Sequence, residues 1–520
     1  MIRIYVITVM CASCLCLFAQ PDIEWAYSFG GTSSDAPRCM ALTSDGGSIA
    51  AGGSSSNDGD VSANNGGSDY WVVKLDGQGA IQWEVSLGGS AFDEAQSILQ
   101  TADGGYIVAG YSNSIDGDVS GNHGSHDGWV VKLDGLGNME WQKCLGGADL
   151  DGFHSVIQLP DASYALTGGT RSNDGDVSGN HGDNDLWLVE LDPNGVLLNQ
   201  KCFGGSLNDS GRTIKRTMDQ GYLLAGSSLS NDGDVSGHHG PDDHYDMWVV
   251  KTDTSGAIQW QRSLGGSDDD VGYTALQAAD GDHLVAGIAH SSDGDVSVSH
   301  GHFDVWLVRL DAMGDLEWER SYGGSETEHC LSIQPTLDGG FLLGCHSSSS
   351  DGDVTGHIGS PDYWLLEVND VGDIQWQRCL GGTSADIATS AYQMEDGSFI
   401  IGGYARSTNG DVLGNHGLYD YWIVKLFPYP AAIPAATAEG NGVVLIPNPG
   451  SHGFTVMMTG LSAENGRLVL SDAQGRQVAE VTVHNGSAHV SAQHAMAGMY
   501  FYRILDATGL PVASGKWVKE

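Results

Sequence analysis

The stretch Gly88–Leu145 reads GGSAFDEAQSILQTADGGYIVAGYSNSIDGDVSGNHGSHDGWVVKLDGLGNMEWQKCL, and its internal pattern decides the fold. Runs rich in β-forming residues alternate with short segments rich in Gly and Asp, a pattern typical of strands separated by turns. The predicted strands are Ala95–Thr101, Tyr106–Tyr111, Trp129–Leu133 and Met139–Cys144. Because most of the connections are tight Gly/Asp turns, the stretch predicts four antiparallel strands joined in sequence.

The same unit occurs seven times in the chain. Each copy opens with a glycine pair, at Gly30-Gly31, Gly88-Gly89, Gly146-Gly147, Gly204-Gly205, Gly265-Gly266, Gly323-Gly324 and Gly381-Gly382. The spacing is 58 residues except for one step of 61, where a loop gains three residues near Pro241–His244. A fixed period of this length, built from short strands, predicts a propeller or a repeat array.

The two ends of the repeat region indicate how the array is completed. The last unit stops at Leu426, before its fourth strand, whereas Ile23–Phe29 supplies a fourth strand that precedes the first unit. A ring in which the two ends build one blade together accounts for both observations and favours a propeller over an open solenoid. We therefore predict an all-β chain whose residues 20–427 form a seven-bladed β-propeller, with four-stranded blades and the last blade closed by the N-terminal strand.

Two tryptophan series follow the repeat. One marks the third strand of every unit: Trp71, Trp129, Trp187, Trp248, Trp306, Trp364 and Trp422. The other marks the fourth strand, with Asn199 as its exception: Trp25, Trp83, Trp141, Trp260, Trp318 and Trp376. Stacked blades need buried rings at fixed repeat positions, so we interpret both series as packing between blades rather than as a platform for sugars.

The pattern Lys-Leu-Asp-x-x-Gly-x-Ile-x-Trp, followed by x-x-Leu-Gly-Gly-Ser, resembles the bacterial seven-bladed β-propeller repeat family over residues 23–426. It is also faintly similar to the quinoprotein-type blade. The resemblance implies an architecture and leaves the activity open, because such folds host unrelated functions.

The loop between the second and third strands is acidic in every unit. In the third unit Asp174, Asp176, Ser178 and Asp185 stand at positions 1, 3, 5 and 12, a spacing that resembles the oxygen donors of a calcium loop. The equivalent acids in the other units are Asp58, Asp60 and Asp69; Asp116, Asp118 and Asp127; Asp232, Asp234 and Asp246; Asp293, Asp295 and Asp304; Asp351, Asp353 and Asp362; and Asp411 and Asp420, which follow Asn409. We predict Ca²⁺ binding here with a dissociation constant of about 10⁻⁴ to 10⁻³ M.

Three departures keep a second interpretation of these loops open. Position 12 is Asp rather than Glu, position 5 is Leu413 in the last unit, and position 6 is Ala63 in the first. Asp-Gly and Asn-Asp pairs also form Asx turns without any metal. Histidines recur in the same loop, with Gly66 aligned in the first unit, and we expect them to pack or form hydrogen bonds: His123, His181, His239, His300, His357 and His416.

A second acidic series stands five residues after the first glycine of each pair: Asp35, Asp93, Asp151, Asp209, Asp270, Glu328 and Asp386. In an up-and-down blade the 2–3 and 4–1 connections emerge on the same face, so both acidic series should lie at one end of the propeller. The second series is expected either to accept hydrogen bonds from loop N–H groups or to form a ligand or cation ring at the channel mouth.

The charge of the chain excludes some partners. Asp and Glu number 66 against 22 Lys and Arg, a net charge of −44, which disfavours nucleic acid and anionic membrane surfaces. The sequence holds no Gly-x-Ser-x-Gly elbow, phosphate loop or HExxH motif. Repeated residues are mostly structural, so the leading prediction is a monomeric, non-catalytic binding or adhesion module for an extracellular glycan or protein.

Two further functions stay open at this point. The first is a secreted lyase or glycosidase that acts on polysaccharide in the channel, and the second is a structural spacer in a surface layer. An asymmetric cluster of Glu, Arg, Tyr or His at one channel mouth would favour the enzyme. Uniform blades with bound cations would favour the binding module.

The N-terminal residues have the features of an export signal. Arg3 precedes an apolar run, Ile4–Phe18, and Leu17-Phe18-Ala19 offers a cleavage point, so we predict a signal peptide over residues 1–19. Lipidation at Cys14 is an alternative. We predict no membrane-spanning segment in the mature chain. Cys330 and Cys345 flank one hairpin turn. They could form a disulfide or could be two small buried residues, and both interpretations stay open.

The C-terminal residues follow a different pattern from the repeats. After a Pro/Ala-rich linker, residues 428–442, four motifs stand in order: Pro447–Pro449, Leu470–Arg476, Ala497–Arg503 and Gly515–Lys519. Residues 443–520 closely resemble the C-terminal sorting domain of the type IX secretion system of Bacteroidetes, with about seven short strands in a small β-sandwich. The resemblance implies passage through the type IX secretion machinery and a secreted or outer-membrane surface-attached protein. A carbohydrate-binding or immunoglobulin-like sandwich is the alternative.

Overall fold

The computed structural model describes residues 20–428 and, in the C-terminal part, 442–446, 453–459, 466–472, 476–483, 487–491, 498–505 and 511–519. The predicted signal peptide and residues 429–441 of the predicted linker lie outside the described residues. The chain divides into two compact units, Met1–Tyr429 and Pro430–Glu520, which are taken separately below. The described residues form strands and no helix.

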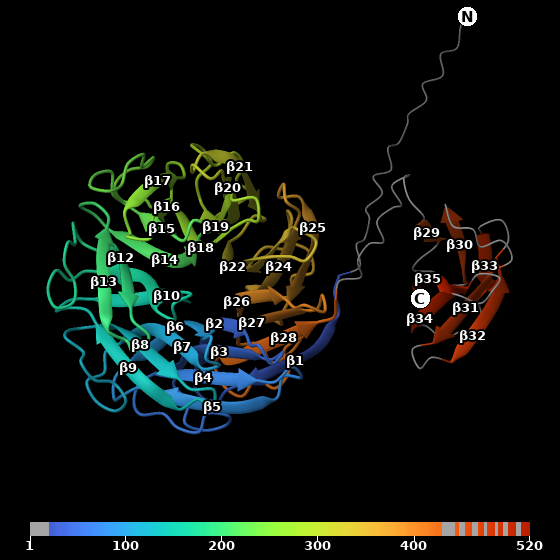
Figure 1. Cartoon of the computed structure of the whole chain (residues 1–520), viewed down its shortest axis with the longest axis horizontal. Coiled ribbons are helices and arrows are strands. Elements are labelled where there is room, and N and C mark those ends of the chain that lie inside the picture. Colours follow the sequence, from blue (N-terminus) through green and yellow to red (C-terminus); the bar gives the residue numbers. More distant parts are fainter. Residues whose placement is uncertain are drawn as a thin grey trace, which may run out of the picture. The chain divides into compact units, whose positions relative to one another are not determined.

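The first unit contains seven four-stranded antiparallel sheets, which we number as blades 1 to 7 (Figure 1). Blades 1 to 3 comprise β2 (Asp35–Leu42), β3 (Ser48–Ser54), β4 (Asp69–Leu75) and β5 (Ile81–Leu87); β6 (Asp93–Gln100), β7 (Tyr106–Ser112), β8 (Asp127–Leu133) and β9 (Met139–Leu145); and β10 (Asp151–Gln158), β11 (Tyr164–Thr170), β12 (Asp185–Leu191) and β13 (Leu197–Phe203). Blades 4 to 6 comprise β14 (Asp209–Arg216), β15 (Tyr222–Ser228), β16 (Asp246–Thr252) and β17 (Ile258–Leu264); β18 (Asp270–Gln277), β19 (His283–Ala289), β20 (Asp304–Leu310) and β21 (Leu316–Tyr322); and β22 (Glu328–Pro335), β23 (Phe341–Ser347), β24 (Asp362–Val368) and β25 (Ile374–Leu380).

Blade 7 is assembled from both ends of the repeat region. Its strands are β26 (Asp386–Gln393), β27 (Phe399–Ala405), β28 (Asp420–Leu426) and β1 (Ile23–Phe29). The antiparallel pairing of β1 with β28 confirms the predicted role of the N-terminal strand. On the other side, β2 of blade 1 contacts β26 and β27.

Blade strands begin earlier than the sequence predicts. In blade 2, β6 starts at Asp93 and β8 at Asp127, whereas the prediction placed both starts two residues later. The reason is that Asp93 and Asp127 both pair with Ser112 on the strand between them. In addition, the Asp93 N–H donates to the Ser68 carbonyl of blade 1 at 2.6 Å, which fixes the backbone of a residue type that is poor at forming strands.

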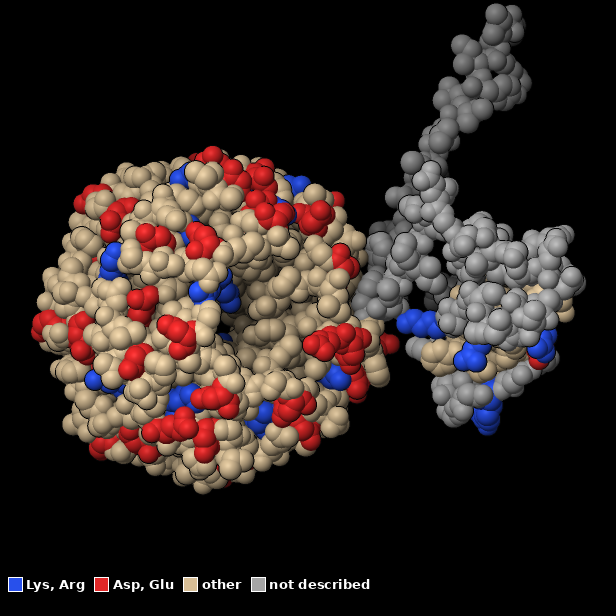
Figure 2. Space-filling view, in the orientation of Figure 1, with Lys and Arg blue, Asp and Glu red and all other residues tan. Residues whose placement is uncertain are grey.

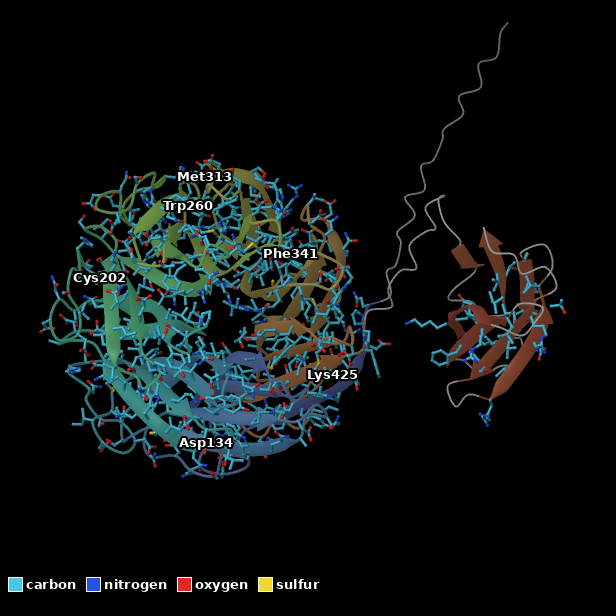
Figure 3. All side chains as sticks on the ribbon, viewed as in Figure 1. Asp134, Cys202, Trp260, Met313, Phe341 and Lys425 are labelled. Atoms are coloured by element: carbon cyan, nitrogen blue, oxygen red, sulfur yellow. The ribbon has the colours of Figure 1, made fainter. Side chains whose placement is uncertain are left out.

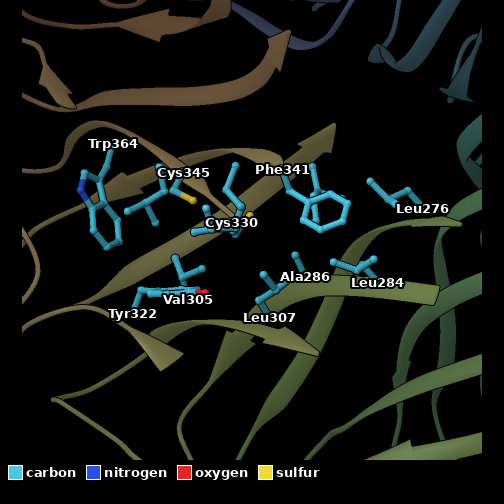
Figure 4. Packing of buried hydrophobic residues seen from close by; sticks show 14 of the residues in the cluster. Leu276, Leu284, Ala286, Val305, Leu307, Tyr322, Cys330, Phe341, Cys345 and Trp364 are labelled. Atoms are coloured by element: carbon cyan, nitrogen blue, oxygen red, sulfur yellow. The ribbon is translucent and has the colours of Figure 1, made fainter. Parts of the chain in front are cut away.

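Neighbouring blades pack face to face through apolar side chains. Figure 4 shows the boundary between blades 5 and 6, where Val305 and Leu307 of β20 face Cys345 and Trp364 of blade 6, all of them fully buried. Cys330 lies opposite Cys345 in the register of β22 and β23, and both are free thiols. Of the two interpretations of this pair, the structure shows two small buried residues.

Both tryptophan series pack as predicted. The third-strand tryptophans have no exposed surface, and the indole N–H of Trp129 donates to Gln142 Oε1 at 2.8 Å. Five of the fourth-strand tryptophans lie against the 3–4 turn of the next blade. The sixth, Trp376, donates its indole N–H to Glu367 at 2.6 Å and packs against the Phe399 ring of blade 7, where the fourth strand is the N-terminal one. In Figure 3 Trp260 lies beside the turn that contains Met313, and its indole N–H donates to the Ala312 carbonyl at 3.3 Å. Rings at fixed positions therefore join each blade to the next.

The first strand of each blade lies at the centre of the unit. Consecutive inner strands contact one another, in the order β2, β6, β10, β14, β18, β22 and β26, and β26 contacts β2. They surround the central opening seen in Figures 1 and 2. Side chains on these strands that point away from the blades therefore line the channel.

The second unit consists of two sheets that share one core. Its strands are β29 (Gly442–Ile446), β30 (Gly453–Thr459), β31 (Arg467–Asp472), β32 (Gln477–Thr482), β33 (Ser487–Ser491), β34 (Gly498–Leu505) and β35 (Pro511–Lys519). The sheet orders are β29-β30-β33 and β32-β31-β34-β35. Val456 and Val490 of the first sheet and Leu468 and Trp517 of the second belong to the same buried cluster. In the described parts of the chain, no helix has the length and apolarity needed to cross a membrane.

Candidate functional site

The 2–3 loops and the 4–1 connections lie on one face, as predicted, and they are joined by the acidic side chains. Asp174 Oδ1 accepts a hydrogen bond from the Ala148 N–H at 2.8 Å, and Asp176 Oδ2 accepts one from the Gly146 N–H at 3.4 Å. All seven units repeat both bonds, with Asn409 in the place of the first aspartate in blade 7. We call this the loop face.

The four predicted calcium donors of one loop do not converge. Asp185 accepts from the His181 N–H at 2.9 Å and lies beside Gly204 of the next blade, away from Asp174 and Asp176. Ser178 Oγ accepts from Gln200 Nε2 at 2.7 Å, on the outer strand. Among the described residues, no three or more His, Cys, Asp or Glu side chains are placed to hold one metal ion. Calcium binding stays a prediction.

The loop histidines other than His357 form hydrogen bonds, as expected, whereas the ring of His357 is packed with its Nε2 buried and unbonded, and two of the alignments were wrong. His181 Nδ1 lies 2.7 Å from Asp185 Oδ2, and the histidines of blades 2, 4 and 7 repeat that contact. In blade 1 Asn65 takes this place rather than Gly66, because the Asn65 N–H donates to Asp69 Oδ2 at 2.6 Å. In blade 6 the equivalent N–H is that of Ile358, one residue after His357.

The second acidic series accepts hydrogen bonds inside the protein. Asp93 has no exposed surface, and its Oδ2 accepts from the Gly89 N–H and from Ser114 Oγ, both at 2.8 Å. Its other oxygen accepts from Ser112 Oγ. Of the two interpretations, the hydrogen-bonding one is confirmed, because these buried carboxylates join the 4–1 connection to the second strand of the blade.

Each blade boundary contains a buried pair of carboxylates. Gly88 lies between Asp69 of blade 1 and Asp93 of blade 2, so a Cβ atom on Gly88 would lie 2.8 Å from Asp69 Oδ1 and 2.6 Å from Asp93 Oδ2. Asp69 Oδ1 and its six repeat equivalents are buried without a hydrogen-bond partner. Burial, with the charges of Asp93 and Asp118, raises the pKa of Asp69 to about 6. The pairs favour a bound proton as the pH falls below neutral.

Residues that break the repeat gather on the inner strands near the loop face. On one side, Arg38 Nε donates to Glu94 Oε1 at 2.6 Å, and the Tyr111 hydroxyl donates to Glu94 Oε2 at 2.5 Å. Burial and the nearby Glu94 charge raise the pKa of Tyr111 above its ordinary range, so the phenol stays neutral. These three side chains form one connected polar group.

A cluster of rings lies on blades 5 and 6. It consists of Tyr273, His290, Phe303, His329 and His346, and we call it the ring cluster. The ring centroids are 6.2 Å apart for Tyr273 and His329, 6.1 Å for Phe303 and His329, 5.0 Å for His329 and His346, and 4.8 Å for His290 and Phe303. All five side chains are partly exposed. Burial, with the neighbouring His329, lowers the pKa of His346 to about 3, so its imidazole is neutral.

Sequence reasoning missed both groups because it concentrated on what repeats. Their signal is a change of residue type at one repeat position. Where blade 6 has His329, the other blades have Ala36, Glu94, Gly152, Ser210, Val271 and Ile387. A position this variable inside an otherwise regular unit is free of the packing that holds the blade, so it can serve a ligand.

Comparison with known proteins identifies the second unit. A model described as the secretion system C-terminal sorting domain matches residues 444–520. The chain carries a type IX secretion sorting domain. The sorting domain makes this a secreted or outer-membrane surface-attached protein, exported by the type IX machinery.

Similarity to other known proteins is weaker. A segment of the chain is 27% identical over 177 residues to the regulatory protein FlaEY of Caulobacter vibrioides, which is 32% of this chain and 18% of that protein. Among solved structures, PorZ, a surface component of the type IX secretion system of Porphyromonas gingivalis, is 12% identical with a TM-score of 0.42, over 95% of this chain and 60% of that one. A puromycin hydrolase is 12% identical with a TM-score of 0.45, over 91% and 59%.

Proposed function

We propose that this protein is a non-catalytic binding module displayed outside the cell, in which a closed seven-bladed propeller holds an extracellular glycan or protein ligand at its channel mouth. The ring cluster carries this proposal. Partly exposed aromatic and imidazole rings on rigid strands suit stacking against a sugar or an aromatic side chain, and they need little ordering on binding. Export by type IX secretion supports an extracellular ligand.

Contacts between blades 7 and 1 support the closed ring. The Asp35 N–H donates to the Tyr419 carbonyl at 2.7 Å, and the same bond joins Asp93 to Ser68 between blades 1 and 2. The Tyr421 hydroxyl also donates to the Trp71 carbonyl at 2.9 Å. A closed ring would place all seven inner strands around one channel, which the ligand site requires.

Binding is tested on a glycan array with the mature protein, followed by titration of any hit. Tyr273→Ala and His329→Ala should each weaken binding about 5- to 150-fold, by analogy with base stacking on one aromatic ring, which is worth roughly 1–3 kcal/mol. Ile387→Ala is the matched control, because Ile387 occupies the repeat position of His329 in blade 7 and belongs neither to the ring cluster nor to β14. Equal affinity of all three variants and the wild type would contradict the assignment of the ring cluster.

Calcium stabilisation of the acidic loops is tested by calorimetric melting with calcium and with chelator. A rise of several degrees, with several ions bound per chain, would support the prediction. An unchanged melting temperature would leave the loop aspartates as the Asx-turn and hydrogen-bonding groups described above.

A secreted polysaccharide lyase or glycosidase is the second candidate, and the group of Arg38, Glu94 and Tyr111 favours it. It is an asymmetric set of an acid, a cation and a phenol on the channel wall, which is the arrangement that distinguishes an enzyme from uniform blades. Release of new reducing ends or unsaturated products from polysaccharides, abolished by Glu94→Gln, would establish it. Binding without cleavage would support the binding module.

A further inference from the structure

One inner strand carries nearly all the positive charge of the channel wall. β14 reads DSGRTIKR, and Arg212, Lys215 and Arg216 are three of the four Lys and Arg residues on the seven inner strands. The fourth, Arg38, is paired with Glu94. In Figure 2, Lys and Arg atoms lie at the edge of the central opening, on the side where Figure 1 labels β10 and β14. Such a concentration stands out in a chain with a net charge of −44.

The three cations of β14 have no acidic partner among the described residues. Elsewhere in the blades a buried lysine is paired, as Lys132 is with Asp103 at 3.0 Å. By contrast, the buried Nε atoms of Arg212 and Arg216 have no hydrogen-bond partner. Burial also lowers the pKa of Lys215. All three side chains are partly buried, and the hydrogen-bond partners of the two guanidinium groups are neutral side chains, Gln220 for Arg216 and His154 for Arg212. Partly desolvated cations without a bonded carboxylate would stabilise an anion bound beside them.

Space for such an anion adjoins Arg216. A cavity of about 530 Å³ is lined by Lys215, Arg216 and Gln220 and by no carboxylate. A neighbouring cavity of about 350 Å³ has Asp161 and Glu190 beside Arg216. The volume of the first falls in the range of roughly 300–1,000 Å³ that is usual for small-ligand sites. The acidic groups of a ligand therefore belong in the first cavity, because the two carboxylates of the second would repel them.

The boundary between blades 3 and 4 is built differently from its neighbours. At four other boundaries a glutamine ends the inner strand, and its side-chain oxygen accepts a hydrogen bond from a backbone N–H in the 1–2 turn of the preceding blade. Gln158 accepts such a bond from the Ala102 N–H at 2.8 Å. Here Arg216 stands in place of that glutamine, and Pro160, which has no N–H, stands in place of the donor.

The turns beside this boundary are strained as well. Ala162 and Gln220 replace the turn glycine of the other blades, and they adopt φ angles of 69° and 75°. Non-glycine residues in this region cost energy and cluster at functional sites. Asn199 also replaces the fourth-strand tryptophan at this boundary and at no other.

We propose that β14 and the adjoining cavity lined by Lys215 and Arg216 bind the acidic groups, carboxylate or sulfate, of an anionic polysaccharide that enters the central channel. The inference rests on the proposed binding role and adds the charge of the ligand. Arg212 lies over the Tyr273 ring of the ring cluster at 5.8 Å, so cations for acidic groups and rings for sugar faces are contiguous. The negative charge elsewhere on the chain acts weakly here, because physiological salt screens exposed charges beyond about 8 Å.

The test uses the mature full chain and three polymers: polygalacturonate, chondroitin sulfate and neutral dextran. The double variant Lys215→Leu/Arg216→Gln introduces residues that other blades carry at the same positions, Leu99 and Gln158, so it should fold. We expect at least about 100-fold weaker binding of the acidic polymer, because each charge-assisted hydrogen bond that the variant removes is worth about tenfold in affinity. Lys143→Gln/Arg320→Gln, on the outer strands β9 and β21, also removes two positive charges and is the charge-matched control, which should stay within about twofold of the wild type.

The two acidic polymers distinguish uronate from sulfate recognition, and binding of either supports the proposal if the double variant loses it. Wild-type binding should also weaken as salt is added, which gives a measure independent of the variant. Acidic-polymer binding that the double variant retains would overturn the inference. Binding of a neutral glycan alone, abolished by Tyr273→Ala, would overturn it while leaving the proposed binding role intact, and binding of no polymer would count against both.

Discussion

The boundary between blades 2 and 3 and the boundary between blades 3 and 4 are built from the same unit, and three of the residues that differ hold contacts between blades at the first boundary. The first has Trp141 over the next turn, Gln158 bonded to the preceding turn, and Ala102 as the donor. The second has Asn199, Arg216 and Pro160 at those positions. Both keep the buried carboxylate pair and the fully buried third-strand tryptophan.

The difference separates two kinds of position within one repeat. The buried carboxylate pair and the third-strand tryptophan are the same at both boundaries, because changing them would leave a cavity or an unpaired charge. Residues at the channel wall and at the outer rim can change without that cost. The repeated framework therefore stabilises the fold, and the boundary between blades 3 and 4 is available for a ligand.

Removing a ring from the shared framework should have the largest effect. Trp129→Ala deletes a fully buried indole and its bond to Gln142, and we expect a loss of about 3–5 kcal/mol in unfolding free energy. Denaturant unfolding measures it. Asn199→Ala, at the rim of the altered boundary, should change stability by less than about 1 kcal/mol. Equal losses in the two variants would contradict the separation between framework and rim.

Adding a methyl group at the opening glycine should destabilise both boundaries alike. A Cβ atom on Gly146 would lie 2.6 Å from Asp151 Oδ2, and one on Gly204 would lie 2.6 Å from Asp209 Oδ2. Gly146→Ala and Gly204→Ala should each cost about 1–3 kcal/mol, as overpacking of a buried site does. Gly152→Ala is the control, since the atom nearest to its Cβ position is Tyr111 Cβ at 3.4 Å, an ordinary van der Waals distance, and its φ is not positive. A loss at only one of the two boundaries would show that the acidic network is not shared.

The carboxylate pairs should make stability fall as the pH rises toward neutral. The pKa of Asp69 and of Asp270 is raised to about 6, mainly by burial, above the unfolded value of about 3.9. Between these two pKa values the folded protein binds more protons than the unfolded one. The stabilisation that these protons give is therefore complete below pH 4 and is lost as the pH rises through 6. The melting temperature should therefore be higher near pH 5 than at pH 8, and Asp69→Asn should reduce that difference.

Other aspartates set the acid limit of that stability. Burial raises the pKa of Asp103, but hydrogen bonds from Thr101 and Lys132 lower it by more and hold it at about 2. Its contribution is present above pH 4 and is lost as the pH falls toward 2. A melting temperature that rises steadily from pH 5 to pH 8 would contradict the assignment of protons to the pairs.

The smallest expected effect distinguishes the two boundaries directly. Gln158→Ala removes the acceptor of the Ala102 N–H and should cost about 0.5–1.5 kcal/mol. Arg216→Ala, at the same repeat position in the next blade, removes an unpaired cation, and stability should stay constant or rise. Parallel melting curves of the two variants provide the measurement, and a larger loss for Arg216→Ala would show that the arginine is structural.

The amino-acid sequence was enough to establish the repeat, the four strands of each blade, the pairing of Ile23–Phe29 with the last blade and the packing of the tryptophans. These follow from local patterns of period two, from turn residues and from a fixed spacing, all of which are visible along the chain. The sorting domain was also recognisable, because its motifs stand in order within one short segment.

Which carboxylates are neighbours became apparent only in three dimensions. Asp174 and Asp185 belong to one loop, yet Asp174 bonds to the connection entering its own blade while Asp185 lies against the next blade. The ring cluster and β14 likewise bring together residues from different blades. Sequence spacing reports neighbours along the chain, whereas these contacts form between blades, where the relative placement of two sheets decides which side chains meet.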